Sequence, residues 1–239
     1  MQSNLLCYNH NVLFNVLNWN IGFAHTMLAI GGFLLAIMIA LILHEWAHAY
    51  AAYKSGDPTA KMMGRMTLNP KKHVEPLGLL MFLFVGIGWA KPVPVNPFNY
   101  KNFKRGNFWV SIAGVLTNLI IGFVASFALF LLTHFAGNHL LVSAPLWLFA
   151  LGMFLEFLVM INIALMLFNL LPIPPLDGYN LLRSFTKPNN RYMQFARNNS
   201  MILIMIVLVL SILGYGVFVL GGYIIGGFNS LWALIFGSV

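Results

Sequence analysis

The chain has 239 residues, of which 60% are hydrophobic and only 8% are charged. A soluble globular domain carries about 25% charged residues, so this composition excludes an ordinary soluble domain and predicts a polytopic membrane protein. The formal net charge of +8 is interpreted as a marker of membrane orientation, and nucleic acid is not an expected partner.

Hydrophobic segments are predicted at 27–53, 77–90, 108–134, 146–172 and 201–227. Four of them are long enough to cross a bilayer as helices. The second has about 14 residues and is therefore predicted to enter the membrane and return on the same side. The sequence GWAKPVPVNP that follows alternates Val and Pro, which favours an extended piece at the membrane surface. The expected fold is all-α, with about four transmembrane helices and a re-entrant hairpin or extended segment.

The basic residues support this topology. All 13 Lys and Arg lie in 54–76, 91–107 and 173–200. If 77–90 returns, all three clusters share one side of the membrane, whereas a crossing would divide them. The positive-inside rule then predicts cytoplasmic basic loops and extracytoplasmic termini.

The first span ends in a candidate metal site, His44-Glu45-Trp46-Ala47-His48. Residues four apart share a helix face, so both imidazoles can hold one zinc ion within the membrane. Glu45 is placed to act as the general base toward a water molecule. The alternative is a chance pair of histidines that bond to their neighbours. The cost of burying an unpaired carboxylate at membrane depth argues against it.

A third ligand is required, and Asp177 is the best candidate. It lies in FNLLPIPPLDGYNLL (168–182), where prolines must end the preceding helix. Gly178 is expected to permit an unusual backbone angle. Irregular backbone at membrane depth is tolerated where it lines a cavity, and the topology brings both motifs to the same face. The alternative is a surface turn with Asp177 as a helix N-cap.

These two motifs, His44 to His48 and Asn169 to Gly178, resemble the signatures of the site-2 proteases, which are intramembrane zinc metalloproteases. Segments 64–78 and 88–97 are similar to the compact bacterial branch without a PDZ domain. The resemblance implies zinc held by His44, His48 and Asp177, with Glu45 as catalytic base. It also implies hydrolysis of peptide bonds within or next to transmembrane segments, as in regulated intramembrane proteolysis, in a bacterial-type plasma membrane.

Four further residues are candidates for substrate binding or transition-state support. The family's Ala-Gly-Pro-x-x-Asn element reads here as 113–118, with Val115 in place of proline. Asn118 is expected to stabilise the oxyanion or bind substrate, or alternatively to bond between helices. Asn169 could support the helix bend or hold substrate. The segment with Val93 and Val95 could pair with an unwound substrate as an added strand.

The expected partners are single-pass membrane proteins or signal-peptide remnants as substrates, together with the lipid bilayer. The expected organisation is an extracytoplasmic segment (1–26), a metalloprotease core (27–185) and a C-terminal helix and tail (186–239). A metal-binding membrane transporter is the alternative function, because His and Asp inside a membrane also suit ion passage.

Overall fold

The structure is a computed structural model that describes residues 22–85, 88, 90–136, 144–187, 190–212 and 216–237. Within these residues every regular element is a helix, in agreement with the all-α prediction. Most of the predicted 1–26 segment lies outside the described residues. The helices are α2 (Phe23–Ser55), α3 (Thr59–Met62), α4 (Pro70–His73), α5 (Pro76–Val85), η2 (Pro97–Asn99), α6 (Phe103–Ala136), α7 (Leu146–Asn169), α8 (Asp177–Arg183), α9 (Arg191–Asn198), α10 (Ser200–Ile212) and α11 (Val217–Phe236).

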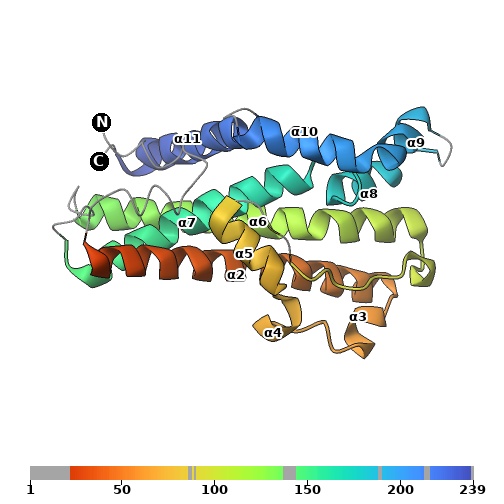
Figure 1. Cartoon of the computed structure of the whole chain (residues 1–239), viewed down its shortest axis with the longest axis horizontal. Coiled ribbons are helices and arrows are strands. Elements are labelled where there is room, and N and C mark those ends of the chain that lie inside the picture. Colours follow the sequence, from red (N-terminus) through yellow and green to blue (C-terminus); the bar gives the residue numbers. More distant parts are fainter. Residues whose placement is uncertain are drawn as a thin grey trace.

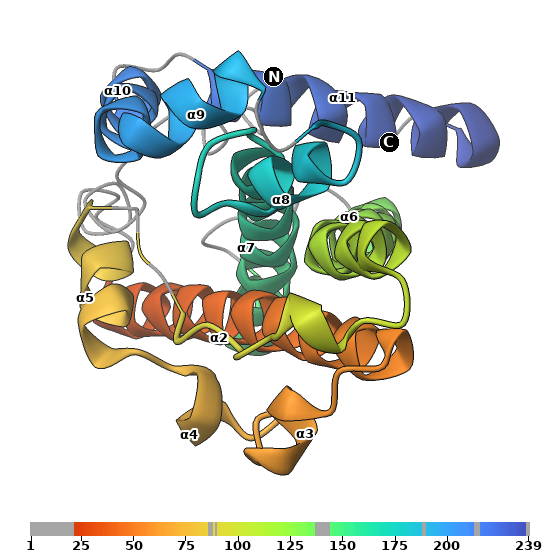
Figure 2. The ribbon, with the colours of Figure 1, turned by 90° about the vertical axis from the view of Figure 1, so that its right-hand side faces the viewer.

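Helices α2, α6 and α7 enclose the main hydrophobic core. Figures 1 and 2 show α2 on one side of α6 and α7, with α9 to α11 on the other. The buried face of α2 repeats small residues at helical spacing, which lets neighbouring helices approach closely. His44 follows Ala40 and precedes Ala47 on this face, so helix packing turns its ring into the bundle. The buried alanines of this face are Ala29, Ala36, Ala40 and Ala47.

Four helices are long and apolar enough to cross a membrane, at Phe23–Ser55, Phe103–Phe135, Leu146–Asn169 and Val219–Phe236. This confirms a multi-pass membrane protein. The first three contain most of the predicted segments 27–53, 108–134 and 146–172. Helix α7 ends at Asn169 rather than at 172, because a helix usually stops before a proline such as Pro172.

The prediction of one continuous span at 201–227 was wrong. The structure divides this region into α10 and α11, and the apolar span begins later, at Val219. Gly216 precedes α11 with a φ of 78°, a left-handed conformation that a continuing helix cannot contain. The helices on both sides of this interruption are hydrophobic, so the hydrophobicity of the sequence did not reveal it.

Helix α5 is too short to cross a membrane, as expected of the predicted re-entrant segment. Its ten residues span about 15 Å, half the thickness of a hydrocarbon core. The Lys91 backbone N–H donates to the carbonyl oxygen of His73 at 2.8 Å. The chain after α5 therefore returns to the chain that precedes this helix. Figure 1 shows the first turn of α2 and the last turn of α11 at the same end of the molecule, as an even number of crossings requires.

Candidate metal centre

Three side chains from two distant motifs converge inside the helix bundle. His44 Nε2 and His48 Nε2 lie 3.0 Å apart. Asp177 Oδ2 lies 3.3 Å from the first and 3.2 Å from the second. The exposed fractions of these side chains are only 7%, 12% and 16%. Among the described residues, this is the cluster of His, Cys, Asp and Glu that could hold a metal ion.

The geometry fits a zinc ion. Ligand bonds of about 2.0–2.1 Å at tetrahedral angles place neighbouring ligand atoms roughly 3.3 Å apart. The three observed separations lie close to that value. Asp177 Oδ2 is buried without a hydrogen-bond partner, and such an orphaned oxygen needs a cation to offset its desolvation. Two imidazoles and a carboxylate are also a donor set that zinc accepts.

One face of α6 supports the two histidines. His48 Nδ1 donates to the Val110 carbonyl oxygen at 2.7 Å, so in the neutral ring Nε2 keeps its lone pair for the centre. Gly114 lies one turn further along. A Cβ atom there would lie 2.5 Å from His44 Cε1 and 2.6 Å from His48 Nε2. The absence of a side chain at Gly114 therefore leaves the space that both rings occupy.

Asp177 is carried by the turn between α7 and α8. It is the first residue of α8, whose N-cap is Leu176 and which has no side-chain cap, so the alternative N-cap role is not observed. The explanation expected for Gly178 was wrong. This residue lies within α8 and is not among the glycines with positive φ. A Cβ there would overlap the Leu170 carbonyl group, so glycine is required by close backbone contact instead.

Asn107, at the start of α6, holds α8 in place. Its buried amide donates to the Asn180 carbonyl oxygen at 2.5 Å and to Ser184 Oγ at 2.8 Å. Asn180 lies in the short helix that begins with Asp177, and Ser184 is the C-cap of that helix. Helix α6 therefore fixes the positions of the two histidines and of the helix that begins with Asp177.

Glu45 contacts the extended segment 90–96. Its Oε2 atom accepts a hydrogen bond from the Val93 backbone N–H at 2.7 Å. This contact holds one carboxylate oxygen and leaves the other available. The Val93 side chain is buried against Ala49 and Ala60, whereas Val95 is 37% exposed. Of the two valines expected to meet substrate, only Val95 is open to the surroundings.

The extended segment is held at both of its ends as well. Arg65 Nη2 donates to the carbonyl oxygens of Lys91 and Pro92 at 2.7 and 3.1 Å. Asn96 N–H donates to Asp57 Oδ2 at 2.6 Å. Burial acts to raise the pKa of Asp57, but hydrogen bonds from Asn96, Thr59 and Asn99 outweigh it and lower the pKa below its ordinary value. A charged Asp57 thus anchors the segment that meets Glu45.

The two candidate asparagines differ in their surroundings. Asn118 is fully buried, and neither its Nδ2 nor its Oδ1 has a hydrogen-bond partner. It lies one turn beyond Gly114 on α6, so an unpaired amide sits next to the helix face that supports the histidines. The Asn169 amide donates to the Leu165 carbonyl at 3.0 Å, within the last turn of α7. That contact stabilises the helix end before the proline turn.

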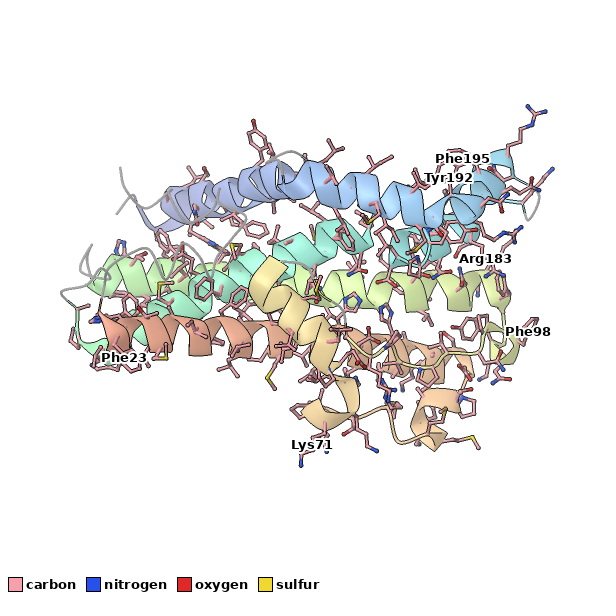
Figure 3. All side chains as sticks on the ribbon, in the orientation of Figure 1. Phe23, Lys71, Phe98, Arg183, Tyr192 and Phe195 are labelled. Atoms are coloured by element: carbon pink, nitrogen blue, oxygen red, sulfur yellow. The ribbon has the colours of Figure 1, made fainter. Side chains whose placement is uncertain are left out.

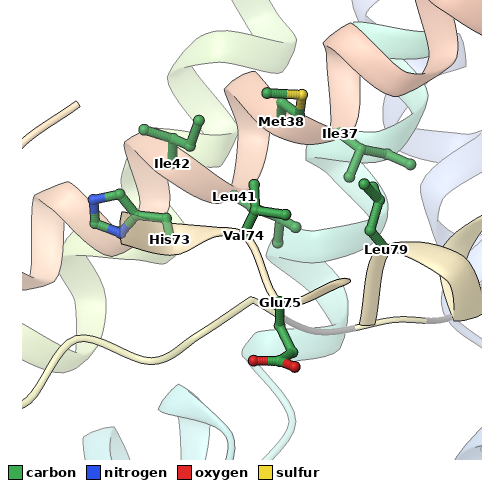
Figure 4. Close-up of a pocket in the computed structure, with 8 residues that line it drawn as sticks. All are labelled: Ile37, Met38, Leu41, Ile42, His73, Val74, Glu75 and Leu79. Carbon is green, nitrogen blue, oxygen red and sulfur yellow. The ribbon is translucent and has the colours of Figure 1, made fainter. Parts of the chain in front are cut away.

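A small apolar pocket beside α2 contains none of the three candidate metal ligands. Figure 4 shows it between α2 and the residues that lead into α5, with the Glu75 carboxylate directed away from Met38. His73 is fully buried there, and its Nε2 atom donates to the Thr67 carbonyl at 2.7 Å. Its role is thus to fix the turn before α5. The lining residues are Ile37, Met38, Leu41, Ile42, His73, Val74, Glu75 and Leu79.

Sequence reasoning assigned no role to Asn107, Val110 or Gly114. Their spacing could have found them, since residues 107, 110, 114 and 118 follow one another at intervals of three and four and share one face of a helix. Two of the four are asparagines and one is glycine, which is unusual for a face buried in an apolar bundle.

Known proteins are similar to this chain over most of its length. Residues 32–213 match the family described as "Peptidase family M50". YwhC of Bacillus subtilis is 39% identical over 180 residues, covering 75% of this chain and 80% of that protein. Rip2 of Mycobacterium tuberculosis is 33% identical over 164 residues, covering 64% of this chain and 57% of that protein. Both relatives carry the name "Putative zinc metalloprotease". No solved structure matches the chain.

The matched segment spans both motifs and most of the described helices. It agrees with the resemblance that His44 to His48 and Asn169 to Gly178 indicated. The chain therefore belongs to peptidase family M50, the site-2 proteases, and the expectation of an intramembrane zinc metalloprotease is confirmed at the level of the family.

Proposed function

We propose that His44, His48 and Asp177 bind the zinc ion and that Glu45 is the catalytic base of this protease. The convergence of three ligand atoms at separations of 3.0 to 3.3 Å carries the proposal. The family membership and the names of the relatives support zinc as the metal. The centre accounts for the burial of polar side chains that would otherwise be costly in a membrane.

The roles of the side chains follow from their contacts. A zinc ion held by His44, His48 and Asp177 would act as a Lewis acid that makes a water molecule easier to deprotonate. Glu45 takes a proton at its free carboxylate oxygen while Val93 N–H holds the other oxygen, and it later gives that proton to the leaving amide nitrogen. The buried, unpaired Asn118 amide is suited to donate to the oxyanion of the peptide under attack.

The substrates proposed are transmembrane segments of single-pass membrane proteins or signal-peptide remnants. A helical substrate hides its amides in hydrogen bonds and must unwind before attack. The segment around Val93 and Val95 has extended backbone beside Glu45, which suits pairing with an unwound strand.

A photo-crosslinker at Val95 is expected to capture a model transmembrane substrate bound to the Glu45→Gln protein. Val95 is partly exposed and two residues from the contact with Glu45, whereas Phe98 is 97% exposed but lies beyond the Asp57 anchor. A crosslinker at Phe98 is therefore the matched control and should capture less substrate. Equal capture at both positions would argue against strand pairing.

The proposed orientation places both termini outside and the three basic clusters in the cytoplasm, with the protease core at 27–185 between the 1–26 and 186–239 segments. The charge distribution supports this orientation.

In intact cells a membrane-impermeant maleimide is expected to label Cys7, the single cysteine. In a Cys7→Ser background, Lys71→Cys should be labelled only after permeabilisation, since Lys71 is exposed on α4. Labelling of Lys71→Cys in intact cells would reverse the orientation.

The ligand set is tested by zinc content. Purified His44→Ala, His48→Ala and Asp177→Ala proteins are expected to lose zinc and cleavage of a model transmembrane substrate, because three protein ligands are the minimum for a catalytic site. His73→Ala is the matched control, because this histidine is fully buried but lies outside the centre. Full zinc occupancy in the Asp177→Ala protein would remove Asp177 from the ligand set.

A further inference from the structure

The metal centre does not explain a basic and aromatic surface around α9. We define the α9 surface by the exposed residues Arg183, Phe185, Lys187, Arg191, Phe195 and Arg197. Phe185 and Phe195 are 71% and 55% exposed. Figure 3 shows Arg183 and Phe195 at the same end of the molecule, with Arg183 below α9. Residues 178–239 contain these four cations and no acidic residue, so the surface has no internal counter-charge.

The orientation of α9 suits the surface of a membrane. Helix α9 meets the apolar stretch of α10 at an angle of 76°, across a break at Asn199. The exposed side chains of α10 are apolar, among them Met201 and Ile202. If α10 lies in lipid, α9 lies close to the membrane plane. It buries Met193 and Ala196 against the protein and leaves its cationic and aromatic side outward.

We propose that the α9 surface binds the headgroups of anionic phospholipids. Cations beside exposed aromatic rings are the composition of interfacial helices, whose rings lie at the headgroup level. The direct covalent connection to α10 brings the surface to that level, and its charge is complementary to anionic headgroups. An acidic peptide would match the charge but would give no reason for the phenylalanines.

The α9 surface is also coupled to the turn that carries Asp177. Tyr192 Oη donates to the Pro172 carbonyl oxygen at 2.8 Å, and Tyr179 Oη donates to the Met193 carbonyl oxygen at 3.3 Å. Pro172 and Tyr179 lie on either side of Asp177 in the sequence. Lipid that holds α9 in place should therefore also restrict the movement of the turn that carries Asp177. This second step rests on the proposed role of Asp177, whereas lipid binding itself does not.

The test of lipid binding uses the purified full chain in neutral detergent, titrated with phosphatidylglycerol or phosphatidylcholine while the melting temperature is measured. Phosphatidylglycerol is expected to stabilise the wild type more than phosphatidylcholine does. In Arg191→Gln/Arg197→Gln the same stabilisation should require roughly 30-fold more phosphatidylglycerol, since each cation near an anionic surface contributes about fivefold. Lys71→Gln/Lys72→Gln, which removes two exposed cations from α4, is the matched control and should respond like the wild type.

An unchanged response of Arg191→Gln/Arg197→Gln would overturn the proposal, as would equal stabilisation by both lipids. If that variant responds normally to lipid but cleaves acidic substrates less well, the surface binds substrate and the proposal is also wrong.

The coupling is tested by the rate of zinc loss to a chelator. Phosphatidylglycerol is expected to slow this loss in the wild type but not in Tyr192→Phe, which keeps every cation and the ring and lacks only the hydroxyl bonded to Pro172. If the lipid slows zinc loss equally in both proteins, the Tyr192 hydroxyl does not couple lipid binding to the metal centre. If Asp177 is not a ligand, lipid will not slow zinc loss in either protein, while the melting-temperature result stands.

Discussion

Glu45→Gln is expected to abolish cleavage of a transmembrane substrate and to leave the zinc content of the purified protein unchanged. Glutamine has nearly the same shape, and its carbonyl oxygen can still accept the hydrogen bond from Val93 N–H. It cannot take a proton at neutral pH. General base catalysis contributes about 10²- to 10⁴-fold, so turnover should fall by at least that factor with little change in KM. Turnover and zinc content are measured on the same preparation.

This variant separates a protease from a metal transporter. A carrier needs its ligands His44, His48 and Asp177 but has no use for a proton acceptor at position 45. The matched control is Glu75→Gln, the same chemical change at a residue outside the centre. Cleavage by Glu45→Gln at the wild-type rate would rule out Glu45 as the catalytic base. Loss of zinc would show that Glu45 is needed for metal binding.

The sequence was most informative where the chemistry is local. His44 and His48 share a helix face because they are four residues apart, and the prolines before Asp177 require a broken helix wherever they occur. The return of the chain after α5 was also predictable, since a segment of that length cannot cross a bilayer. Each of these features depends on neighbours in the sequence and on the physics of the membrane.

Contacts between distant segments were not predictable in the same way. The hydrogen bond from Val93 N–H to Glu45 joins residues 48 positions apart, and a backbone donor has no signature in the sequence. Gly178 was explained by backbone freedom, but the structure attributes it to the nearby Leu170 carbonyl group. The span expected at 201–227 was wrong because its interruption before α11 is apolar on both sides. In each case the decisive fact is a three-dimensional approach or a local break that hydrophobicity does not record.

Gly114→Ala is expected to remove zinc and activity while the helix bundle stays folded. The added Cβ would lie 2.5 to 2.6 Å from atoms of both His44 and His48, distances that real Cβ contacts do not adopt. The nearest atoms belong to the two side chains and not to backbone, so the strain is relieved when the rings rotate out of the centre. Misplaced ligands lower metal affinity, and we expect a loss of at least about 100-fold, the upper end for perturbed supporting contacts.

Gly31→Ala provides the matched control, because Gly31 is also inside a membrane helix but its Cβ would have no atom within 4 Å. That variant should keep wild-type zinc affinity, and alanine is the better helix former by about 1 kcal/mol. Zinc affinity is measured by chelator competition, and the fold by the melting temperature without metal. Without zinc, Gly114→Ala should melt no lower than the wild type. The clash matters only when both rings point into the centre, and alanine favours the helix. Wild-type zinc affinity in Gly114→Ala would mean that α6 shifts to make room for the added Cβ. The positions of His44 and His48 would then not depend on a glycine at position 114.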